Sequence, residues 1–162
     1  QSALVHPWFE HKVSPVRGQM LATTPLPMLF ECPIYADHGY DYWRQDKLGR
    51  VILGGWRNLD PESEVGLAEL LNHQIQDKMT EFIRSFYPKI PVNLSHQWSG
   101  IMGFAVDGLP ICGKLPGSDV LVSVGFTGHG FGFAWACGTR IVELLLEGRA
   151  TSIDHFAPTR LS

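Results

Sequence analysis

The sequence has few cysteines and no cluster of basic residues, and these absences exclude several classes of protein. Only 3 of its 162 residues are cysteine, with no Cys-x-x-Cys pair, so neither a disulfide framework nor a cysteine-based metal site is expected. We predict instead that Cys32, Cys112 and Cys137 are buried free thiols. Charged residues make up 18% of the chain and the net charge is −3, without a basic cluster. This charge balance argues against a nucleic-acid-binding surface.

Long apolar segments are also missing. No apolar run approaches the roughly 20 residues of a membrane-spanning helix, and the first residues do not resemble a signal peptide. We therefore expect a cytoplasmic protein with no membrane span. The histidines are scattered, His6 and His11 included, so no metal site is expected. The spacing of Ser, His, Asp and Cys residues supports no nucleophilic site.

The hydrophobic residues, 44% of the chain, are enough for one core. Residues 39–44 alternate aromatic and polar side chains, the period of a half-buried strand. A turn at 47–50 and an apolar strand at 51–55 complete an antiparallel hairpin. Residues 12–24 predict an edge or bulged strand, because Pro15 interrupts them.

A helix and further strands are predicted next. Asp60-Pro61, followed by acidic residues, is typical of a helix start, although Gly66 favours a later one. Apolar residues keep helical spacing through 71–86, and Tyr87-Pro88 ends the helix. Residues 91–105 predict one or two strands.

The last third predicts two strands and a helix. After a turn at Asp107-Gly108 come a short returning strand at 111–113 and a buried strand at 120–124. The helix at 131–146 is apolar on nearly every side and stops at Gly148. Such a helix belongs inside a larger body, so we expect exposed apolar surface and self-association of this chain. Because strands and helices do not alternate, the fold class is α+β with a mainly antiparallel sheet and flanking helices.

A glycine-rich stretch at 120–133 is the most informative feature. It predicts a strand, then a turn, then a helix start, with four glycines at Gly125, Gly128, Gly130 and Gly132. Glycine permits close approach of the backbone to a ligand, and a helix N-terminus attracts an electron-rich group. The turn lacks the last glycine of a GxGxxG dinucleotide motif, since Phe133 occupies that position.

Three segments together resemble one family. Residues 98–113, Trp-Ser-Gly through Asp-Gly-Leu-Pro-Ile-Cys-Gly, resemble the W-x-G…DG-x-P-x-x-G signature of FAD-dependent amine and amino-acid oxidoreductases. Residues 125–130 resemble the flavin-contacting loop of that family, and residues 13–20 resemble its strand into the substrate domain. The family includes D-amino-acid oxidase, glycine oxidase and sarcosine oxidase.

The resemblance implies a domain organisation. Residues 1–97 match a portion of the substrate-binding domain. Residues 98–162 match a C-terminal segment that completes the substrate and FAD-binding domains, including the terminal strand, loop and helix of the latter. The N-terminal Rossmann unit of the family is absent from this sequence. We therefore expect the C-terminal part of a longer protein, inactive by itself. FAD in the whole protein is expected to be noncovalent, because the position of the family's flavin-linked cysteine falls near Gly100 rather than at Cys112.

The resemblance also implies site residues. Backbone contacts to the flavin ring are implied for Phe126, Thr127, Gly128, His129, Gly130, Phe131 and Gly132. A plain tight turn is the alternative for this segment, and His129 is as readily a structural histidine.

For the substrate, the family implies contacts at Tyr40, Tyr42, Arg44 and Met102. Tyr40 and Tyr42 are expected on one strand face, and ordinary sheet aromatics are their alternative. Met102 stands where amino-acid-specific members carry a carboxylate-binding arginine, and a thioether cannot form that ion pair. Either another residue such as Arg44 binds the carboxylate, or the substrate is an amine without one.

The resemblance implies hydride transfer from the carbon of a C–N bond to FAD. Because this step depends on positioning and on the flavin rather than on a strong base, we assign no catalytic residue. The substrate is a small amine or amino acid. The alternative is a non-catalytic remnant or an isolated structural domain.

Overall fold

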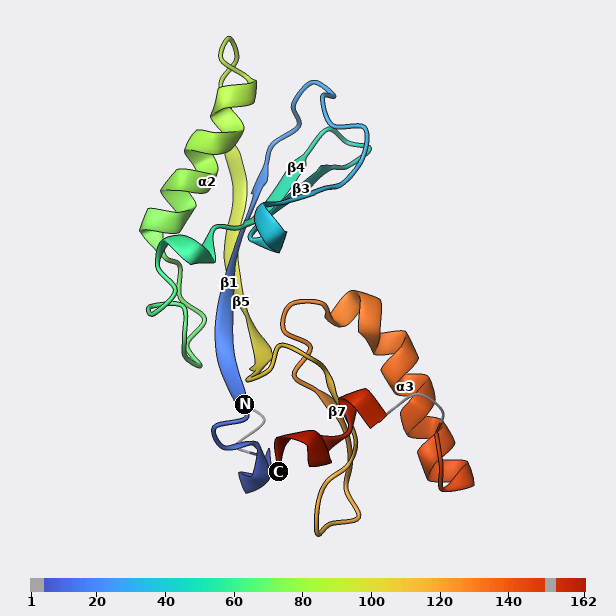
Figure 1. Cartoon of the computed structure of the whole chain (residues 1–162). Helices are drawn as coiled ribbons and strands as arrows, with labels where there is room; N and C mark the ends of the chain where they lie inside the picture. The colour runs from blue at the N-terminus through green and yellow to red at the C-terminus, as the bar shows by residue number, and fades with distance from the viewer. Residues whose placement is uncertain (1–4, 151–153) are drawn as a thin grey trace. The chain divides into compact units, whose positions relative to one another are not determined.

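The computed structural model describes residues 5–150 and 154–162. The chain divides into two compact units, one formed by residues 1–16 with 102–162 and the other by residues 17–101. Every strand pair whose register is known is antiparallel, and helices accompany the strands (Figure 1). The mixed α+β, mainly antiparallel fold class predicted from the sequence is confirmed. Within the described residues, no helix is both long and apolar enough to cross a membrane.

The main sheet has five strands in the order β2-β3-β4-β1-β5. Their bounds, in chain order, are β1 Val13–Thr23, β2 Ile34–Ala36, β3 Asp41–Gln45, β4 Val51–Gly55 and β5 Leu94–Ala105. β3 and β4 form the predicted hairpin, with Trp43 opposite Leu53. The segment after residue 91 forms one strand, β5, rather than two.

The prediction of an edge strand at residues 12–24 is wrong, because β1 lies between β4 and β5. Proline is tolerated there because of its position. Pro15 precedes the part of β1 that pairs with β4, which runs from Gln19 opposite Gly55 to Ala22 opposite Ile52. The missing N–H of proline therefore removes no bond to β4.

Helix α2 (His73–Phe86) covers one face of this sheet. Its Ile75, Met79 and Ile83 are fully buried against Leu21 and Leu53. Because side chains alternate along a strand, the residues next to Leu21 and Leu53 point to the other face. That face is free of α2, and it carries Met20, Tyr42 and Gly54 by the same alternation.

The helix start predicted at Asp60-Pro61 is wrong, whereas the later start that Gly66 favoured is confirmed. Residues 61–64 form a turn, and the Asp60 carboxylate accepts a hydrogen bond from Asn72 Nδ2 at 3.1 Å. Gly66 has a φ of 149°, which no helix contains. Asn72 is the actual N-cap, since its side chain accepts from the backbone N–H of Ile75.

The other unit contains β6 (Ile111–Lys114), β7 (Leu121–Val124) and α3 (Gly130–Glu147). The short strand predicted at 111–113 is present as β6, and it pairs with β7 in a two-stranded sheet, Ile111 opposite Val124. All four β7 residues are half-buried, so the prediction of a buried strand is wrong. The reason is that, among the residues the structure describes, this sheet has only the strands β6 and β7, so neither strand is an interior one. Gly148 ends α3 in the left-handed conformation, at φ 70°, as predicted.

One face of α3 is packed and the other is exposed. Cys137 is buried against Cys112 of β6, with Ile141 and Leu144 beside them. The opposite face carries Trp135, 85% exposed, together with Phe131, Val142, Leu145 and Leu146. The expected exposure of apolar surface over residues 131–146 is thereby confirmed. Of the three cysteines, only Cys112 and Cys137 are buried; Cys32 is exposed, so its predicted burial is wrong.

Short 3-10 helices complete the described residues: η1 (Pro7–Phe9), η2 (Asp37–Gly39), η3 (Arg57–Leu59), η4 (Asp154–Phe156) and η5 (Pro158–Leu161). Of these, η2 precedes β3 and η3 follows β4, each separated from its strand by one residue.

Candidate functional site

The glycine-rich turn between β7 and α3 depends on residues in the left-handed backbone conformation. Gly125 has a φ of 68°, Thr127 of 52° and Gly128 of 82°. A side chain at residue 125 would also be crowded, because its Cβ would lie 3.2 Å from the Cβ of Ala105. The glycine count that singled out this segment in the sequence therefore reflects both its backbone conformation and its close packing.

Thr127 anchors this turn to the end of β5. Its backbone N–H donates to the Gly103 carbonyl at 3.0 Å, and its hydroxyl accepts from the N–H of Ala105 at 3.1 Å. The same hydroxyl donates to the carbonyl of Gly125 at 3.2 Å. With the bridge between Phe104 and Phe126, these bonds fix the turn in one conformation, so the Thr127 side chain is committed to the loop itself.

His129 closes the turn and begins the helix. Its backbone N–H donates to the Phe126 carbonyl at 2.9 Å, and its own carbonyl accepts from Gly132 and Phe133. Its Nδ1 lies 2.9 Å from the Thr127 carbonyl, which requires Nδ1 to carry the proton and donate. The histidine is thus a structural part of the loop, and its ring is exposed.

The first turn of α3 is open. The first N–H groups of a helix have no intrahelical acceptor, and they carry the positive end of the dipole. A Cβ at Gly132 would meet nothing within 4 Å, and Phe131 is fully exposed. Glycine inside a helix lowers helix stability by about 1 kcal/mol relative to alanine. At Gly132 no contact within the described residues would prevent a larger side chain. This turn therefore has room for a group that approaches the backbone closely.

A shallow hollow lies beside the turn, with a volume of about 370 Å³. Met102 and Gly103 of β5 line one side, and the end of β7 with the glycine-rich turn lines the rest. Of the residues predicted to contact a ligand here, the hollow brings together Met102, Phe126, Gly128 and Gly130. Its walls contain no charged side chain, so it suits a flat, largely apolar group held by backbone polar atoms.

The remaining predicted residues belong to the other unit. Tyr42 lies in β3, opposite Tyr35 of β2 and Gly54 of β4. Its hydroxyl lies 3.5 Å from the Met20 sulfur, a weak hydrogen bond. Burial raises the pKa of the Tyr42 phenol, while the positive charge of Arg57 acts in the opposite direction. The phenol is therefore protonated at neutral pH.

Tyr40 does not share the strand face of Tyr42, contrary to the sequence prediction. It follows η2, with helical backbone angles, and β3 begins only at Asp41. The turn before it contains Asp37 and His38 with positive φ, which interrupts the strand period. The guanidinium carbon of Arg57 lies over its ring, 4.5 Å from the ring centroid, in a cation–π contact.

Arg44 lies in β3 and is exposed. By strand alternation it shares the face of Tyr42. Arg57, which the sequence analysis did not single out, is half-exposed and makes the cation–π contact with Tyr40. Gly103, Ser123 and Val124 also line the hollow and were not predicted to do so, since only the fold brings them beside the turn.

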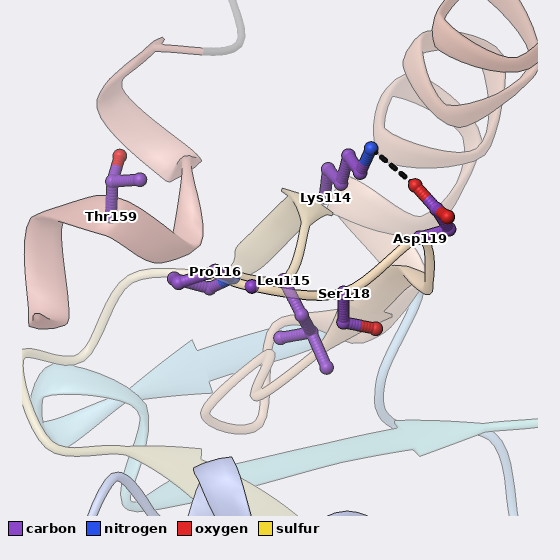
Figure 2. A pocket seen from close by; sticks show the side chains of 7 residues that line it. Lys114, Leu115, Pro116, Ser118, Asp119 and Thr159 are labelled. Atoms are coloured by element: carbon purple, nitrogen blue, oxygen red, sulfur yellow. Dashed lines mark hydrogen bonds and ion pairs between the residues drawn. The ribbon is translucent and has the colours of Figure 1, made fainter.

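A second depression, of about 490 Å³, lies at the turn joining β6 and β7. Figure 2 shows Lys114 and Asp119 there, joined by an ion pair of 2.6 Å. Because the pair neutralises both charges and Asp119 is almost fully exposed, this depression offers no distinctive chemistry. Across residues 5–150 and 154–162, no group of His, Cys, Asp or Glu is arranged to hold a metal ion.

Comparison with protein families gives one match over most of the chain. The family described as "DAO: FAD dependent oxidoreductase" matches residues 1–144. Among curated proteins, the probable oxidoreductase OrdL of Rhizobium meliloti (strain 1021) is 30% identical over 115 residues, covering 70% of this chain. The chain spans only 24% of the length of that relative.

Solved structures share the fold at lower identity. L-proline dehydrogenase from P. horikoshii superposes with a TM-score of 0.70 and 20% identity, covering 92% of this chain and 40% of its own. Glycine oxidase from Geobacillus kaustophilus gives a TM-score of 0.71 and 21% identity, with the same coverage. At such identities the likeness concerns the fold alone, and the chain accounts for less than half of each solved structure.

Proposed function

The chain belongs to the family of FAD-dependent oxidoreductases, and on that premise we propose that it forms part of a flavoenzyme that oxidises the C–N bond of an amine or amino acid. The observation that carries the proposal is the open glycine-rich turn at the start of α3, beside an uncharged hollow. The names of the similar structures, glycine oxidase and L-proline dehydrogenase, support the substrate class.

The residues of the turn fit a flavin ring. A Cβ at Gly132 would fill space that is now open, so a ligand can approach the backbone there without meeting a side chain. We assign the flavin contacts to Phe126, Thr127, Gly128, His129, Gly130, Phe131 and Gly132, mainly through the backbone. FAD, when bound, supplies a two-electron acceptor for the substrate.

The contribution of the turn is electrostatic. The positive end of the α3 dipole favours an electron-rich group beside it, and this preference grows when the group becomes negatively charged on reduction. The bonds of Thr127 to β5 hold the turn in place before any ligand binds. A preorganised turn of this kind loses little free energy to rearrangement on binding.

Noncovalent flavin binding is supported by the position of Cys112. Its thiol is buried, 3.5 Å from the Cys137 carbonyl, and it does not line the hollow. The neutral thioether of Met102, which does line the hollow, provides contact surface and no charge. In the unit of residues 17–101 we assign the substrate contacts to Tyr40, Tyr42 and Arg44. None of the three is assigned as a catalytic base.

Absorbance spectroscopy tests the proposal. The longer protein that contains this chain should carry flavin absorbance bands at ~370 and ~450 nm, generic to oxidised flavins. Small primary and secondary amines, with and without a carboxylate, are added anaerobically. Bleaching of the longer-wavelength band by at least one of them supports the proposal. A protein that takes up no FAD would instead mean that the fold persists here without the chemistry, as a structural remnant.

A further inference from the structure

We propose that Arg160 is a positioning residue for the glycine-rich turn between β7 and α3. Bound to Asp107, it holds the segment of residues 154–162 against both sides of that turn. This inference rests on the proposed function and deepens it, because the turn is where we assign the flavin contacts. All the residues involved belong to the unit formed by residues 1–16 with 102–162.

The guanidinium of Arg160 makes five hydrogen bonds, as many as it has N–H groups. The Asp107 carboxylate accepts two of them, from Nε at 2.7 Å and from Nη2 at 3.1 Å. Nη2 also donates to the Leu109 carbonyl at 2.9 Å. Nη1 donates to the carbonyls of Phe156 at 2.7 Å and Ala157 at 3.3 Å. We call the pair of Arg160 and Asp107 the clasp, since it joins the turn after β5 to the end of η4.

On one side, the clasp reaches the glycine-rich turn through the end of β5. The Gly108 N–H donates to the Ala105 carbonyl at 3.0 Å, which closes the Asp107 turn onto β5. The N–H of Ala105 in turn donates to the Thr127 hydroxyl at 3.1 Å. A Cβ at Gly125 would lie 3.2 Å from the Cβ of Ala105, so β5 lies close to the start of the glycine-rich turn. Because these groups are in direct contact, a displacement of the Asp107 turn reaches the Thr127 anchor.

On the other side, Phe156 packs against the first turn of α3. Its ring lies edge-on to the ring of Phe133, with the centroids 5.8 Å apart and the planes at 71°. Both rings, together with that of Phe126 in the glycine-rich turn, pack on the buried side chains of Cys112 and Cys137. The guanidinium that binds the Phe156 carbonyl therefore also holds an aromatic ring against the start of the helix.

The clasp thus connects the two sides of the hollow. Met102 and Gly103 of β5 line one side, and the glycine-rich turn with the end of β7 lines the rest. When the spacing of the two sides is fixed before a ligand binds, less free energy is lost in ordering them. Arg160 does not itself line the hollow, so it affects a ligand there only through the residues that it holds.

The first experiment needs no flavin and uses this chain as it stands. Amide hydrogen exchange is measured at Ala105 and Thr127, whose N–H groups anchor the turn, and in the ladder of β6 and β7. Arg160→Gln should speed exchange at the two anchor amides about tenfold more than in the ladder, the effect of losing a charge-assisted hydrogen bond. Arg160→Lys should recover part of the protection, because it returns the charge without the planar fork. If Arg160→Gln does not fold, Arg160→Lys against wild type gives the same comparison.

Two controls separate local loosening of the turn from a loss of global stability. Lys114→Gln removes an ion pair of the same unit whose acidic partner, Asp119, is 99% exposed. Wild type is also measured in the urea concentration that matches its unfolding free energy to that of Arg160→Gln. Both controls should leave the ratio of anchor to ladder exchange unchanged. An Arg160→Gln ratio equal to that of the urea-matched wild type would mean a purely structural role and would overturn the inference.

The second experiment titrates FAD into the longer protein that contains this chain, followed by flavin fluorescence and absorbance. Arg160→Gln should raise the Kd for FAD about tenfold and shift the longer-wavelength absorbance band, because the backbone groups beside the ring move. Arg160→Lys should restore part of the affinity, and Lys114→Gln should change neither the Kd nor the band.

The outcomes separate the two proposals. FAD uptake that is unaffected by Arg160→Gln, in a protein whose flavin an amine reduces, would overturn this inference and leave the proposed function standing. FAD uptake that depends on Arg160, in a protein whose flavin no amine reduces, would do the reverse. A longer protein that takes up no FAD would remove the proposed function, and the exchange ratio would still decide whether Arg160 positions the turn.

Discussion

Arg17 and Glu64 form an ion pair inside the unit of residues 17–101, with Arg17 Nη2 3.2 Å from Glu64 Oε1 and both side chains almost completely shielded from solvent. Glu64 also accepts from Gln19 Nε2 at 3.0 Å and from Asn72 Nδ2 at 3.1 Å. Gln76 of α2 continues the network by donating to Gln19. One carboxylate thus connects β1, the segment before α2, and α2 itself.

Removing that carboxylate should destabilise the chain strongly. Glu64→Ala leaves the buried Arg17 guanidinium without its counterion, a change that typically costs about 3–5 kcal/mol. Glu64→Gln keeps the shape and should cost less. Urea unfolding followed by circular dichroism measures the loss. Lys78→Gln, which breaks an exposed ion pair with Glu81, should leave the midpoint unchanged; equal midpoints for Glu64→Ala and wild type would contradict the prediction.

Gly132 should show a trade-off between stability and cofactor binding. Gly132→Ala raises helix propensity by about 1 kcal/mol and meets no atom of the chain, so it should stabilise this chain. In the longer protein the same methyl group should weaken FAD uptake, measured by fluorescence titration.

Gly138→Ala is the matched control for this trade-off, since its Cβ is equally open and lies ~9 Å further along α3. Gly138→Ala should stabilise the chain without weakening FAD uptake. If Gly132→Ala and Gly138→Ala have the same FAD affinity, the turn at Gly132 does not contact the flavin.

Asp107 should stabilise the chain in a pH-dependent way. Its carboxylate accepts hydrogen bonds from Arg160 Nε at 2.7 Å and from Arg160 Nη2 at 3.1 Å. These hydrogen bonds lower the pKa of Asp107. A carboxyl group whose pKa is lower in the folded state stabilises that state above its unfolded pKa, ~3.9, and the contribution disappears as the pH falls through the folded value.

The comparison with Asp107→Asn measures that contribution. At pH ~7 the wild type should be more stable by about 1 kcal/mol, and the two should converge in acid. Asp119→Asn, which breaks the exposed pair with Lys114, should show no such difference. A gap between wild type and Asp107→Asn that persists below the folded pKa would mean that the ion pair is not its cause.

The three thiols should differ in reactivity. Burial raises the pKa of the Cys112 thiol to about 12, and Cys137 is also buried, whereas Cys32 is exposed. Because the thiolate is the reactive form, iodoacetamide at pH ~8 should modify Cys32 rapidly and the other two slowly, as mass spectrometry of peptides would show. Cys32→Ser should abolish the fast phase; rapid labelling of Cys112 in the folded chain would contradict the buried position.

The exposed face of α3 should drive self-association of this chain. Trp135 and Leu145 are 85% and 70% exposed on the same helix, and apolar surfaces of this kind associate in water. Sedimentation should show mass that increases with concentration, and Trp135→Gln with Leu145→Gln should reduce it. Leu48→Gln, an exposed leucine in the β3–β4 turn, should have no effect. Sedimentation as a monomer at all concentrations would contradict the prediction.

Local patterns predicted the elements that depend on local sequence. The alternation at residues 39–44 and the apolar run at 51–55 predicted β3 and β4, because two strands joined by a short turn pair with each other in a hairpin. The helix start at Asp60-Pro61 failed because Asp60 has a distant partner, Asn72. The shared strand face of Tyr40 and Tyr42 failed because positive φ values at Asp37 and His38 do not show in a pattern of apolar residues.

The sequence by itself determined the family, the mainly antiparallel α+β class and the glycine-rich turn, since these depend on motifs and on residues that permit particular backbone angles. Only the tertiary structure decided that β1 is an interior strand, that β6 pairs with β7, and that Arg57 lies over the ring of Tyr40. The physical reason is the same in each case. Strand order and side-chain contacts depend on which surfaces are buried together, and residues far apart in the chain supply those surfaces.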